Sequence, residues 1–441
     1  MRRASVACMV FATSIATWAF VPATRAALPE AFGGEVVLPA PSAVAMVDPT
    51  RIRSSFEASL AEASFDGLYE RRPDGRVVPV LAEGMPVVEG TLARIRLREG
   101  VTHNGGRPLL ARHVVRELSP TSVEIGLARP DAPIASLLCA SSLAIVIGGD
   151  LRRRPLGTGP YRVRLDGRGG AELAIFRAAP DGAPWIDRVR FVPPQARDEE
   201  LRAFELGRLD GSWWGQSLYG GAPSRPATSL TANVIAPVLL VPNRSGVLRD
   251  EGLWSSVVRS IDRGRLERAG LRADRSLGAG LPAAEVGPWQ RLPAGLALRM
   301  IVSADAPLEP RIAEALAGML DEHGVRLAVE RASASRYEAA LQRSEWDLRL
   351  ATVRPPLAEP GALVGAALAA AGQLDRARRV GAAIEDPEVT AQAARTLGAM
   401  VLGHERLALH HRADVLGLRF DSLGRLLLAD ASLARPPERR P

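Results

Sequence analysis

The sequence contains no lysine, so all 56 of its basic residues are arginines. This absence excludes every reaction that depends on a lysine side chain. A phosphate-binding P-loop lysine cannot be present, and neither can a lysine that forms a Schiff base or acts as a general base. Phosphoryl transfer of the P-loop type is therefore excluded by composition alone.

Cysteine is almost absent as well, since the chain has only Cys8 and Cys139. Cys8 precedes an apolar stretch near the N-terminus, and a cysteine that carries a lipid would follow such a stretch. Without Cys8 the chain keeps a single thiol, which cannot form an internal disulfide. Cys139 lies in the apolar run 135–147, so we expect a buried and unreactive thiol there.

Aromatic residues make up only 5% of the chain, and no basic stretch is interleaved with them. The formal net charge is +7, and removal of three arginines in the first 26 residues leaves about +4 (7 − 3). Arginines alternate with acidic residues, a pattern that does not favour nucleic-acid binding. The histidines lack the spacing and acidic support of a metal site, so we expect no metal and no cofactor. They are His103, His113, His323, His404, His410 and His411.

The N-terminus has the features of a secretory signal peptide over residues 1–26. Two arginines begin it, 6–21 is almost wholly apolar, and Thr24-Arg25-Ala26 has small residues at the positions that a signal peptidase reads. The apolar run is short for a membrane span, and no second long apolar run follows. We therefore expect a periplasmic protein without stable membrane insertion, whose mature chain begins near Ala27.

Strand-like and helix-like patterns alternate along most of the remaining chain, which predicts an α/β fold. The clearest unit is β-α-β. Residues 298–302 alternate like a strand, 310–323 are amphipathic at helical spacing, and 325–329 alternate again. Gly324 occupies the position where a helix ends. Residues 234–241 form a nearly continuous apolar run, as expected of a buried strand.

Two short motifs resemble catalytic or cofactor sites but lack the right context. The segment 278–283 has the letters of a dinucleotide fingerprint, yet no strand precedes it and Pro282 stands where its helix should begin. The segment 215–219 lacks the last glycine of a nucleophile elbow. We therefore expect no catalytic residue and no enzyme activity.

The adjacent indoles of Trp213 and Trp214 are a different kind of feature. In an extended segment, neighbouring side chains point to opposite faces. Either one indole lies in the core and the other is an incidental surface residue, or one of them lines a ligand site.

Several short motifs, each weak by itself, follow one order along the chain. The clearest are Gly157-Thr158-Gly159-Pro160-Tyr161 and the stretches 95–101 and 106–114. The others are 47–49, 65–70, 80–83, 186–189, 206–210, Asn243 and 258–263. Together they resemble the peptide/nickel-type extracellular solute-binding proteins of ABC importers, solute-binding protein family 5. The resemblance extends from about 34 to 430.

This resemblance implies an α/β fold of the class II periplasmic-binding-protein type, with two lobes, a cleft and a small extra domain. We expect 27–48, 152–240 and 410–441 to form lobe I, 49–151 a trimmed small domain and 241–409 lobe II. It also implies that a monomer captures a small-molecule or peptide-like ligand in the cleft and docks on ABC permease subunits. The alternative on the same fold is a ligand sensor or an envelope interaction module that does not serve transport.

The sequence departs from that family where a peptide would be held. The peptide-binding branch carries Gly-Trp-x-x-Asp after a strand similar to 346–350, and its aspartate holds the ammonium group of the peptide. Val353 and Pro356 stand here in place of the tryptophan and the aspartate. The comparison with the family therefore implies that free peptides are not held by their N-terminus, unless Glu359 takes over that role.

The expected ligand-binding residues lie in three parts of the chain. The segment after the Asp-Pro step at 48–49 contains Arg53, which would offer a hydrogen-bonding fork to a carboxylate unless it is a solvated surface arginine. Arg53 and Arg354 together favour a neutral or anionic ligand. The full set is Arg53, Ser54, Ser55, Trp213, Trp214 and Arg354.

Overall fold

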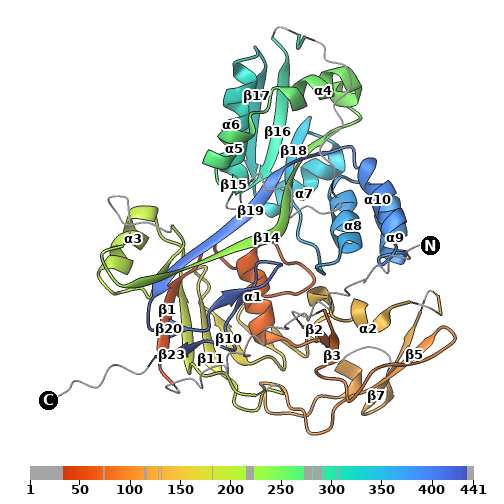
Figure 1. Cartoon of the computed structure of the whole chain (residues 1–441), viewed down its shortest axis with the longest axis vertical. Helices are drawn as coiled ribbons and strands as arrows, with labels where there is room; N and C mark the ends of the chain where they lie inside the picture. Colours follow the sequence, from red (N-terminus) through yellow and green to blue (C-terminus); the bar gives the residue numbers. More distant parts are fainter. Residues whose placement is uncertain are drawn as a thin grey trace, which may run out of the picture.

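The structure is a computed structural model of the chain. It describes residues 33–72, 75–113, 117–127, 129, 130, 132–180, 182–214, 223–272, 281, 291–293, 295–304, 306 and 308–434. The expected signal peptide, the motif at 215–219 and all of the motif at 278–283 except Leu281 lie outside these residues. Figure 1 shows a lower and an upper body joined by two long strands.

The lower body is built on a four-stranded sheet. In spatial order its strands are β1 (Glu35–Pro39), β12 (Arg188–Val192), β11 (Ala171–Ile175) and β10 (Tyr161–Leu165). The pair β1 and β12 is parallel, and the other neighbours are antiparallel. Every second side chain of β10 is buried, so one face of the sheet supplies the core and the other faces solvent.

Helix α1 (Ser55–Ser64) covers the buried face of that sheet. Its Phe56 ring meets Phe191 of the sheet edge to face, with the ring centroids 4.8 Å apart. The helix begins after Ser54, whose hydroxyl oxygen accepts the backbone N–H of Glu57 at 3.1 Å. We expected 49–151 to belong to the small domain. Helix α1 instead packs on the larger sheet, because its apolar side chains are buried in the core of that sheet.

The rest of the lower body is a smaller region with its own core. It contains a four-stranded antiparallel sheet and the hairpin of β2 (Tyr69–Arg71) and β3 (Val77–Pro79). A second hairpin is formed by β8 (Gly148–Asp150) and β9 (Arg154–Leu156). The antiparallel sheet has the order β4 (Val87–Glu89), β5 (Leu92–Arg96), β7 (Ser122–Gly126) and β6 (Glu117–Ser119).

A seven-stranded sheet extends from the lower body into the upper one. Its order is β13 (Gly211–Ser212), β19 (Met400–Arg412), β14 (Ala227–Pro242), β18 (Leu348–Thr352), β16 (Ala297–Ser303) and β17 (Arg326–Ala332), and β15 (Leu271–Arg272) also pairs with β19. The expected β-α-β unit is confirmed, because β16 and β17 are parallel and α6 (Glu309–Asp321) connects them.

Strands β14 and β19 connect the two bodies (Figure 1). They pair antiparallel from Ala227–Arg412 in the lower body to Leu240–Met400 in the upper body. The register shifts between Asn233 and Pro237, and the chain therefore bends in the middle of the crossing. The bodies are thus joined by paired backbone rather than by loose linkers.

Helices cover both faces of the upper part of this sheet, giving one core on each face. No described helix is long and apolar enough to cross a membrane. The upper helices besides α6 are α4 (Glu251–Arg259), α5 (Arg263–Arg268), α7 (Ala334–Arg343), α8 (Pro360–Ala370), α9 (Leu374–Ala382) and α10 (Pro387–Arg395).

Candidate ligand-binding site

Two bodies of the molecule meet at a small polar group formed by Ser55, Arg354 and Glu405, which we call the Arg354 cluster. Arg354 follows β18, and its Nη1 lies 2.8 Å from Glu405 Oε2 on β19. The hydroxyl of Ser55, at the start of α1, is 3.4 Å from the same guanidinium nitrogen and 3.5 Å from the same carboxylate oxygen. The side chains of Arg354 and Glu405 are only 14% and 5% exposed, so this is a nearly buried ion pair.

The backbone around Arg354 fixes the direction of its side chain. The N–H of Val353 donates to Pro237 O on β14 at 2.8 Å, which continues the sheet by one residue beyond β18. Pro355 follows and disfavours a helical turn at Arg354. Arg354 Nε then donates to the carbonyl oxygen of Arg53 at 3.2 Å. The arginine therefore links the upper body to the entrance of α1.

A second buried carboxylate, that of Glu309, binds the end of β18 just before Arg354. Glu309, at the start of α6, accepts the backbone N–H of Ser303 at 3.0 Å and both the N–H and the hydroxyl of Thr352 at 3.1 Å. Burial raises the pKa of this carboxyl group, and these hydrogen bonds together with the charge of Arg354 partly oppose that rise. Glu309 thus ties the end of β18 to the helix behind it.

Arg53 and Ser54 lie beside the cluster but are already engaged within their own segment. The Arg53 guanidinium pairs with Glu57 Oε1 at 2.8 Å, and its backbone N–H donates to Glu57 Oε2 at 2.7 Å. Ser54 caps α1, as described above. The arginine fork that we expected to meet a ligand carboxylate therefore already contacts a carboxylate of the chain.

A second contact joins the small region of the lower body to the upper body. Arg71 at the end of β2 pairs with Glu359, directly before α8, at 2.5 Å. Next to it, Cys139 and Ala140 pack against Leu357 and Ala362 of the upper body. Burial is the largest cause that raises the pKa of the Cys139 thiol to about 11, so the thiol is protonated at neutral pH.

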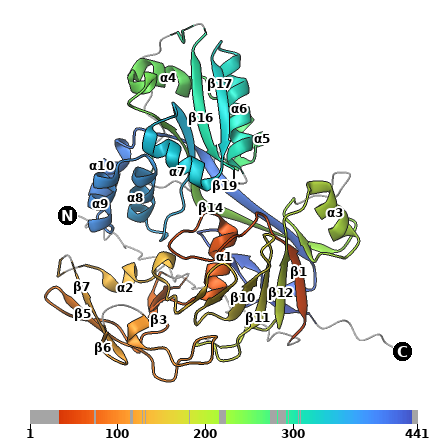
Figure 2. The same ribbon diagram turned by 180° about the vertical axis from the view of Figure 1, so that it is seen from behind.

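The two tryptophans lie in a different place from the other expected site residues. Ser212, which precedes them, pairs with His410 on β19, and five residues of extended strand separate His410 from Glu405, or about 17 Å. Trp213 donates its indole N–H to Pro39 O at 2.8 Å and packs into the lower core. Figure 2 shows α3 (Arg197–Glu205), the helix beside this segment, on the opposite side of the molecule from α8 and α9.

Glu200 of α3 organises the tryptophan segment. Its Oε1 accepts the Ser212 hydroxyl at 2.8 Å and the backbone N–H of Trp213 at 2.7 Å. Trp214 is 41% exposed, and the Arg197 guanidinium lies 5.7 Å from the centre of its ring. One indole is therefore largely in the core and the other on the surface. This placement favours the first of the two alternatives from the sequence, and a ligand role for Trp214 stays a prediction to be tested.

The described residues contain ion pairs at both contacts between the bodies but no assembled metal centre. In the part of the chain that the structure describes, no three His, Cys, Asp or Glu side chains are placed to hold a metal ion. Sequence reasoning did not find Glu405 or Arg71. The signal for Glu405 was a charged residue within a strand-like segment. In the structure the four consecutive residues from Leu402 to Glu405 are buried, so both faces of β19 are covered there.

Comparison with sequences of known proteins gives a limited match. No protein-family model matches the chain. The uncharacterized protein YhjP of Bacillus subtilis is 28% identical over 180 residues, which cover 34% of this chain and 31% of YhjP. The glutathione-binding protein GsiB of Salmonella typhimurium is 26% identical over 171 residues, covering 31% of this chain and 33% of GsiB. The chain thus matches about a third of the length of these curated relatives.

Comparison with solved structures extends over nearly the whole chain. The ABC transporter-associated periplasmic binding protein DppA of Helicobacter pylori, in complex with the peptide STSA, has a TM-score of 0.74 at 12% identity and covers 92% of this chain and 99% of its own. NikA of Staphylococcus aureus, in complex with Ni(L-His)2, has a TM-score of 0.71 at 13% identity, with 91% and 100% covered.

The chain has the fold of the ABC-transporter solute-binding proteins. The expected α/β fold of the periplasmic-binding-protein type is therefore confirmed, and so is the resemblance to the peptide/nickel-type family at the level of the fold. The neighbours with this fold are binding proteins rather than enzymes. The Arg354 cluster lies on the surface where the two bodies of this fold meet.

Proposed function

We propose that this chain is a periplasmic solute-binding protein that captures a small ligand between its two lobes and delivers it to an ABC importer. The lobes would be those expected from the sequence, except that α1 packs on the larger sheet of the lower body, and the mature protein would act as a monomer. The observation that carries the proposal is the Arg354 cluster, in which Arg354, ion-paired with Glu405 and nearly buried, donates a hydrogen bond to Ser55 at the start of α1. Burial of a charged group without its partners costs free energy. Closure that keeps Ser55, Arg354 and Glu405 together would therefore be favoured, and a ligand that prefers the closed state would shift the protein toward it.

The balance of charge along this surface bears on the ligand class. Three arginines lie there, and each pairs with a glutamate: Arg354 with Glu405, Arg53 with Glu57, and Arg71 with Glu359. Three paired positive charges do not create a strong positive field for an anion. We therefore narrow the sequence-based expectation of a neutral or anionic ligand to a neutral or zwitterionic one.

Glu359 bears on peptide binding, because it was the residue that could replace the missing aspartate. Its carboxylate is bound to Arg71, so a peptide ammonium group would have to displace that arginine. Loss of one partner of a buried charge pair costs about 2–5 kcal/mol. Because the side chains of Arg71 and Glu359 are 29% and 20% exposed, we expect the low end of this range, which weakens binding by about thirtyfold. We therefore propose that ordinary free peptides do not bind tightly here through their N-terminus.

Calorimetry with a mixed library of di- to pentapeptides tests this point, run against the same peptides with acetylated N-termini. We expect no micromolar binding in either series. Micromolar binding of the free peptides that acetylation abolishes would contradict the proposal and would assign the ammonium site to Glu359. In that case Glu359→Gln should abolish binding as well.

The single thiol of the mature chain offers a direct test of capture. Native mass spectrometry of the protein purified from its own host first identifies the copurifying ligand. The ligand-free and ligand-loaded protein are then compared for the rate at which a maleimide modifies Cys139. Because Cys139 packs against Leu357 and Ala362 of the upper body, ligand-driven closure should slow its modification.

A matched control moves the thiol away from this contact. In the variant Cys139→Ser with Ser224→Cys, the thiol replaces the Ser224 hydroxyl, which donates to Glu205 of α3. Its modification rate should not respond to the ligand. An equal response of both thiols, or no response of Cys139 to a ligand that binds, would contradict capture between the lobes. A host strain that lacks the protein but takes up the ligand normally would favour the alternative of a sensor.

A further inference from the structure

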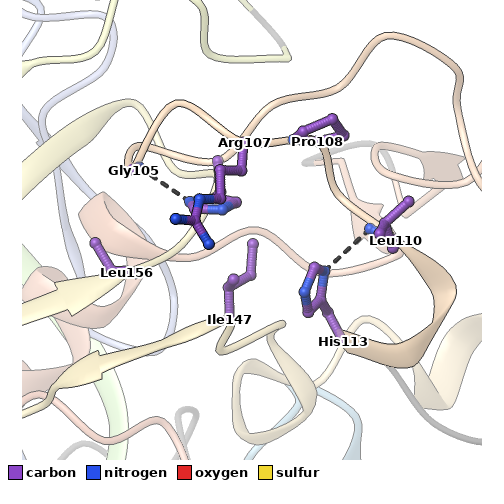
Figure 3. Close-up of a pocket in the computed structure, with 8 residues that line it drawn as sticks. Gly105, Arg107, Pro108, Leu110, His113, Ile147 and Leu156 are labelled. Carbon is purple, nitrogen blue, oxygen red and sulfur yellow. Dashed lines mark hydrogen bonds between the residues drawn. The ribbon is translucent and has the colours of Figure 1, made fainter.

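The small region of the lower body contains a cavity of about 680 Å³ that is separate from the Arg354 cluster (Figure 3). This volume is within the range of small-ligand sites. Its wall combines two histidine rings and one arginine with apolar side chains. The lining residues are His103, Gly105, Arg107, Pro108, Leu110, His113, Ile147 and Leu156.

Backbone hydrogen bonds fix the tautomer of both histidines. The N–H of Gly105 donates to His103 Nδ1 at 3.0 Å, and the N–H of Leu110 donates to His113 Nδ1 at 3.0 Å. An Nδ1 that accepts a hydrogen bond carries no proton, so in each neutral ring the proton is on Nε2. Both rings are therefore hydrogen-bond donors at Nε2. Burial, followed by the charges of His113 and Arg107, lowers the pKa of His103, which favours the neutral ring.

The same bonds disfavour a metal ion at these rings. A metal bound at Nε2 requires a proton on Nδ1, and that proton would meet a backbone N–H in each case. The ring centroids of His103 and His113 are 6.3 Å apart and steeply inclined, at 82°. Both donors thus line the same cavity, without an acidic residue among the eight lining residues.

Glycine at position 105 is needed for this arrangement. A Cβ atom built on Gly105 would lie 2.6 Å from His103 Cε1 and 2.8 Å from its Nδ1. Any side chain at 105 would therefore push the ring away from the N–H that fixes its tautomer. Figure 3 shows Gly105 and Arg107 on one side of the cavity and His113 on the other.

Arg107 supplies the positive charge of the cavity, and none of the other seven lining residues is acidic. Ile147 and Leu156 supply the apolar part of the wall, and the backbone N–H of Ile147 donates to the carbonyl oxygen of Leu156 at 3.0 Å. A single cation with neutral donors matches one negative charge, and the apolar wall matches a hydrocarbon group. A dianion would leave one charge without a partner.

We propose that this cavity binds a small aliphatic carboxylate, with the carboxylate between Arg107, His103 and His113 and the hydrocarbon group on Ile147 and Leu156. The site does not depend on the ligand captured between the lobes, because none of its residues belongs to the Arg354 cluster. Its failure and the failure of the proposed function are thus separate outcomes.

Titration of the mature protein with isobutyrate, followed by NMR of ¹⁵N-labelled histidine rings, tests the site. Before ligand is added, the ring nitrogens of His103 and His113 should report protons on Nε2. Isobutyrate should shift both Nε2–H signals, and isobutyramide of the same shape should do so at least tenfold more weakly, because it lacks the charge. An Nδ1 proton on either ring, or equal binding of the amide, would overturn the proposal.

Three variants locate the site by calorimetry. Arg107→Gln should weaken isobutyrate binding by about tenfold or more, and His113→Phe by about two- to tenfold. The control Arg168→Gln, an exposed arginine outside the cavity, should have no effect.

Gly105→Ala should remove the Nε2–H signature of His103 while the fold, checked by circular dichroism, stays intact. Tighter binding of inorganic phosphate, or binding of Ni²⁺ to these rings, would assign a different ligand class and overturn the carboxylate.

Discussion

Two buried glutamates, Glu405 and Glu200, have opposite kinds of partners. Glu405 lies at the contact between the bodies, where Arg354 neutralises it from the end of β18 and Ser55 approaches it from α1. Glu200 lies at the far end of the same long strands and accepts hydrogen bonds from neutral groups, the Ser212 hydroxyl and the Trp213 N–H. Both side chains are nearly buried, at 5% and 3% of their residue surface.

The two glutamates therefore differ in whether their contacts depend on the relative position of the two bodies. Separation of the bodies would take Ser55 away from Arg354 and Glu405, whereas every partner of Glu200 described here stays in the lower body. An ion pair needs its partner because an uncompensated buried charge costs several kcal/mol. The neutral donors around Glu200 compensate burial only in part, and its pKa is raised.

The largest expected effect is the loss of the buried cation. Arg354→Met should lower the free energy of unfolding by about 3–5 kcal/mol, because Glu405 would remain buried without its partner. Urea unfolding followed by circular dichroism measures this. The double variant Arg354→Met with Glu405→Met should recover most of the loss, since an apolar pair of similar size replaces the charges. A double variant that is less stable than the single one would show that the pair is not coupled in this way.

A smaller effect with its own pH dependence is expected at Glu200. Glu200→Gln should cost about 1–3 kcal/mol, because the amide keeps one acceptor oxygen for the Ser212 and Trp213 donors but replaces the second oxygen by an NH2 group, which cannot accept the hydrogen bond of the Trp214 side chain. Burial raises the pKa of this carboxyl group in the folded state. The stabilisation from its protonated form is therefore complete below the unfolded-state pKa and is lost as the pH rises through the folded-state pKa.

The destabilisation caused by Glu200→Gln should accordingly be larger in acid than at neutral pH. Urea unfolding of both proteins on the two sides of the carboxyl range measures the change. A cost that grows as the pH rises would mean that the ionised carboxylate is the favoured form in the fold.

The exposed ion pair beside the cluster should matter least for stability. Arg53→Gln should change the free energy of unfolding by no more than about 1 kcal/mol, because the arginine side chain is 40% exposed and water screens its charge. Glu57 also keeps the backbone N–H of Arg53 as a donor. The comparison with Arg354→Met under the same conditions provides the measurement. Equal losses would place the two pairs in similar surroundings and contradict the difference in burial.

Ligand affinity should not change when the exposed indole is removed. Trp214→Ala should leave the dissociation constant of the captured ligand within a factor of about two, because Trp214 lies beside α3 and about 17 Å of strand separates its segment from Glu405. Calorimetry with the copurified ligand checks this, and Ser55→Ala in the Arg354 cluster is the contrasting variant that should weaken binding. Loss of affinity in Trp214→Ala alone would return the tryptophans to the ligand site, as the sequence led us to expect.

Local sequence patterns were sufficient for the elements. The spacing of apolar residues over 310–323 and the alternation on either side predicted α6 between the parallel strands β16 and β17. Period and turn residues are properties of neighbouring positions, so they can be read without knowledge of the fold. The order of short motifs likewise indicated the type of fold before any strand pairing was known.

The sequence by itself therefore determined the α/β elements, the fold type and the segments that hold Ser55 and Arg354. Only the tertiary structure decided the partners of these residues. Glu405 is 350 residues from Ser55 and 51 from Arg354, and no local pattern relates positions so far apart. The same holds for α1, which packs on the larger sheet, and for Trp213 and Trp214, which the pairing of β13 with β19 places away from the cluster. Hydrophobic periodicity fixes which face of an element is buried, but only the assembled fold fixes what that face meets.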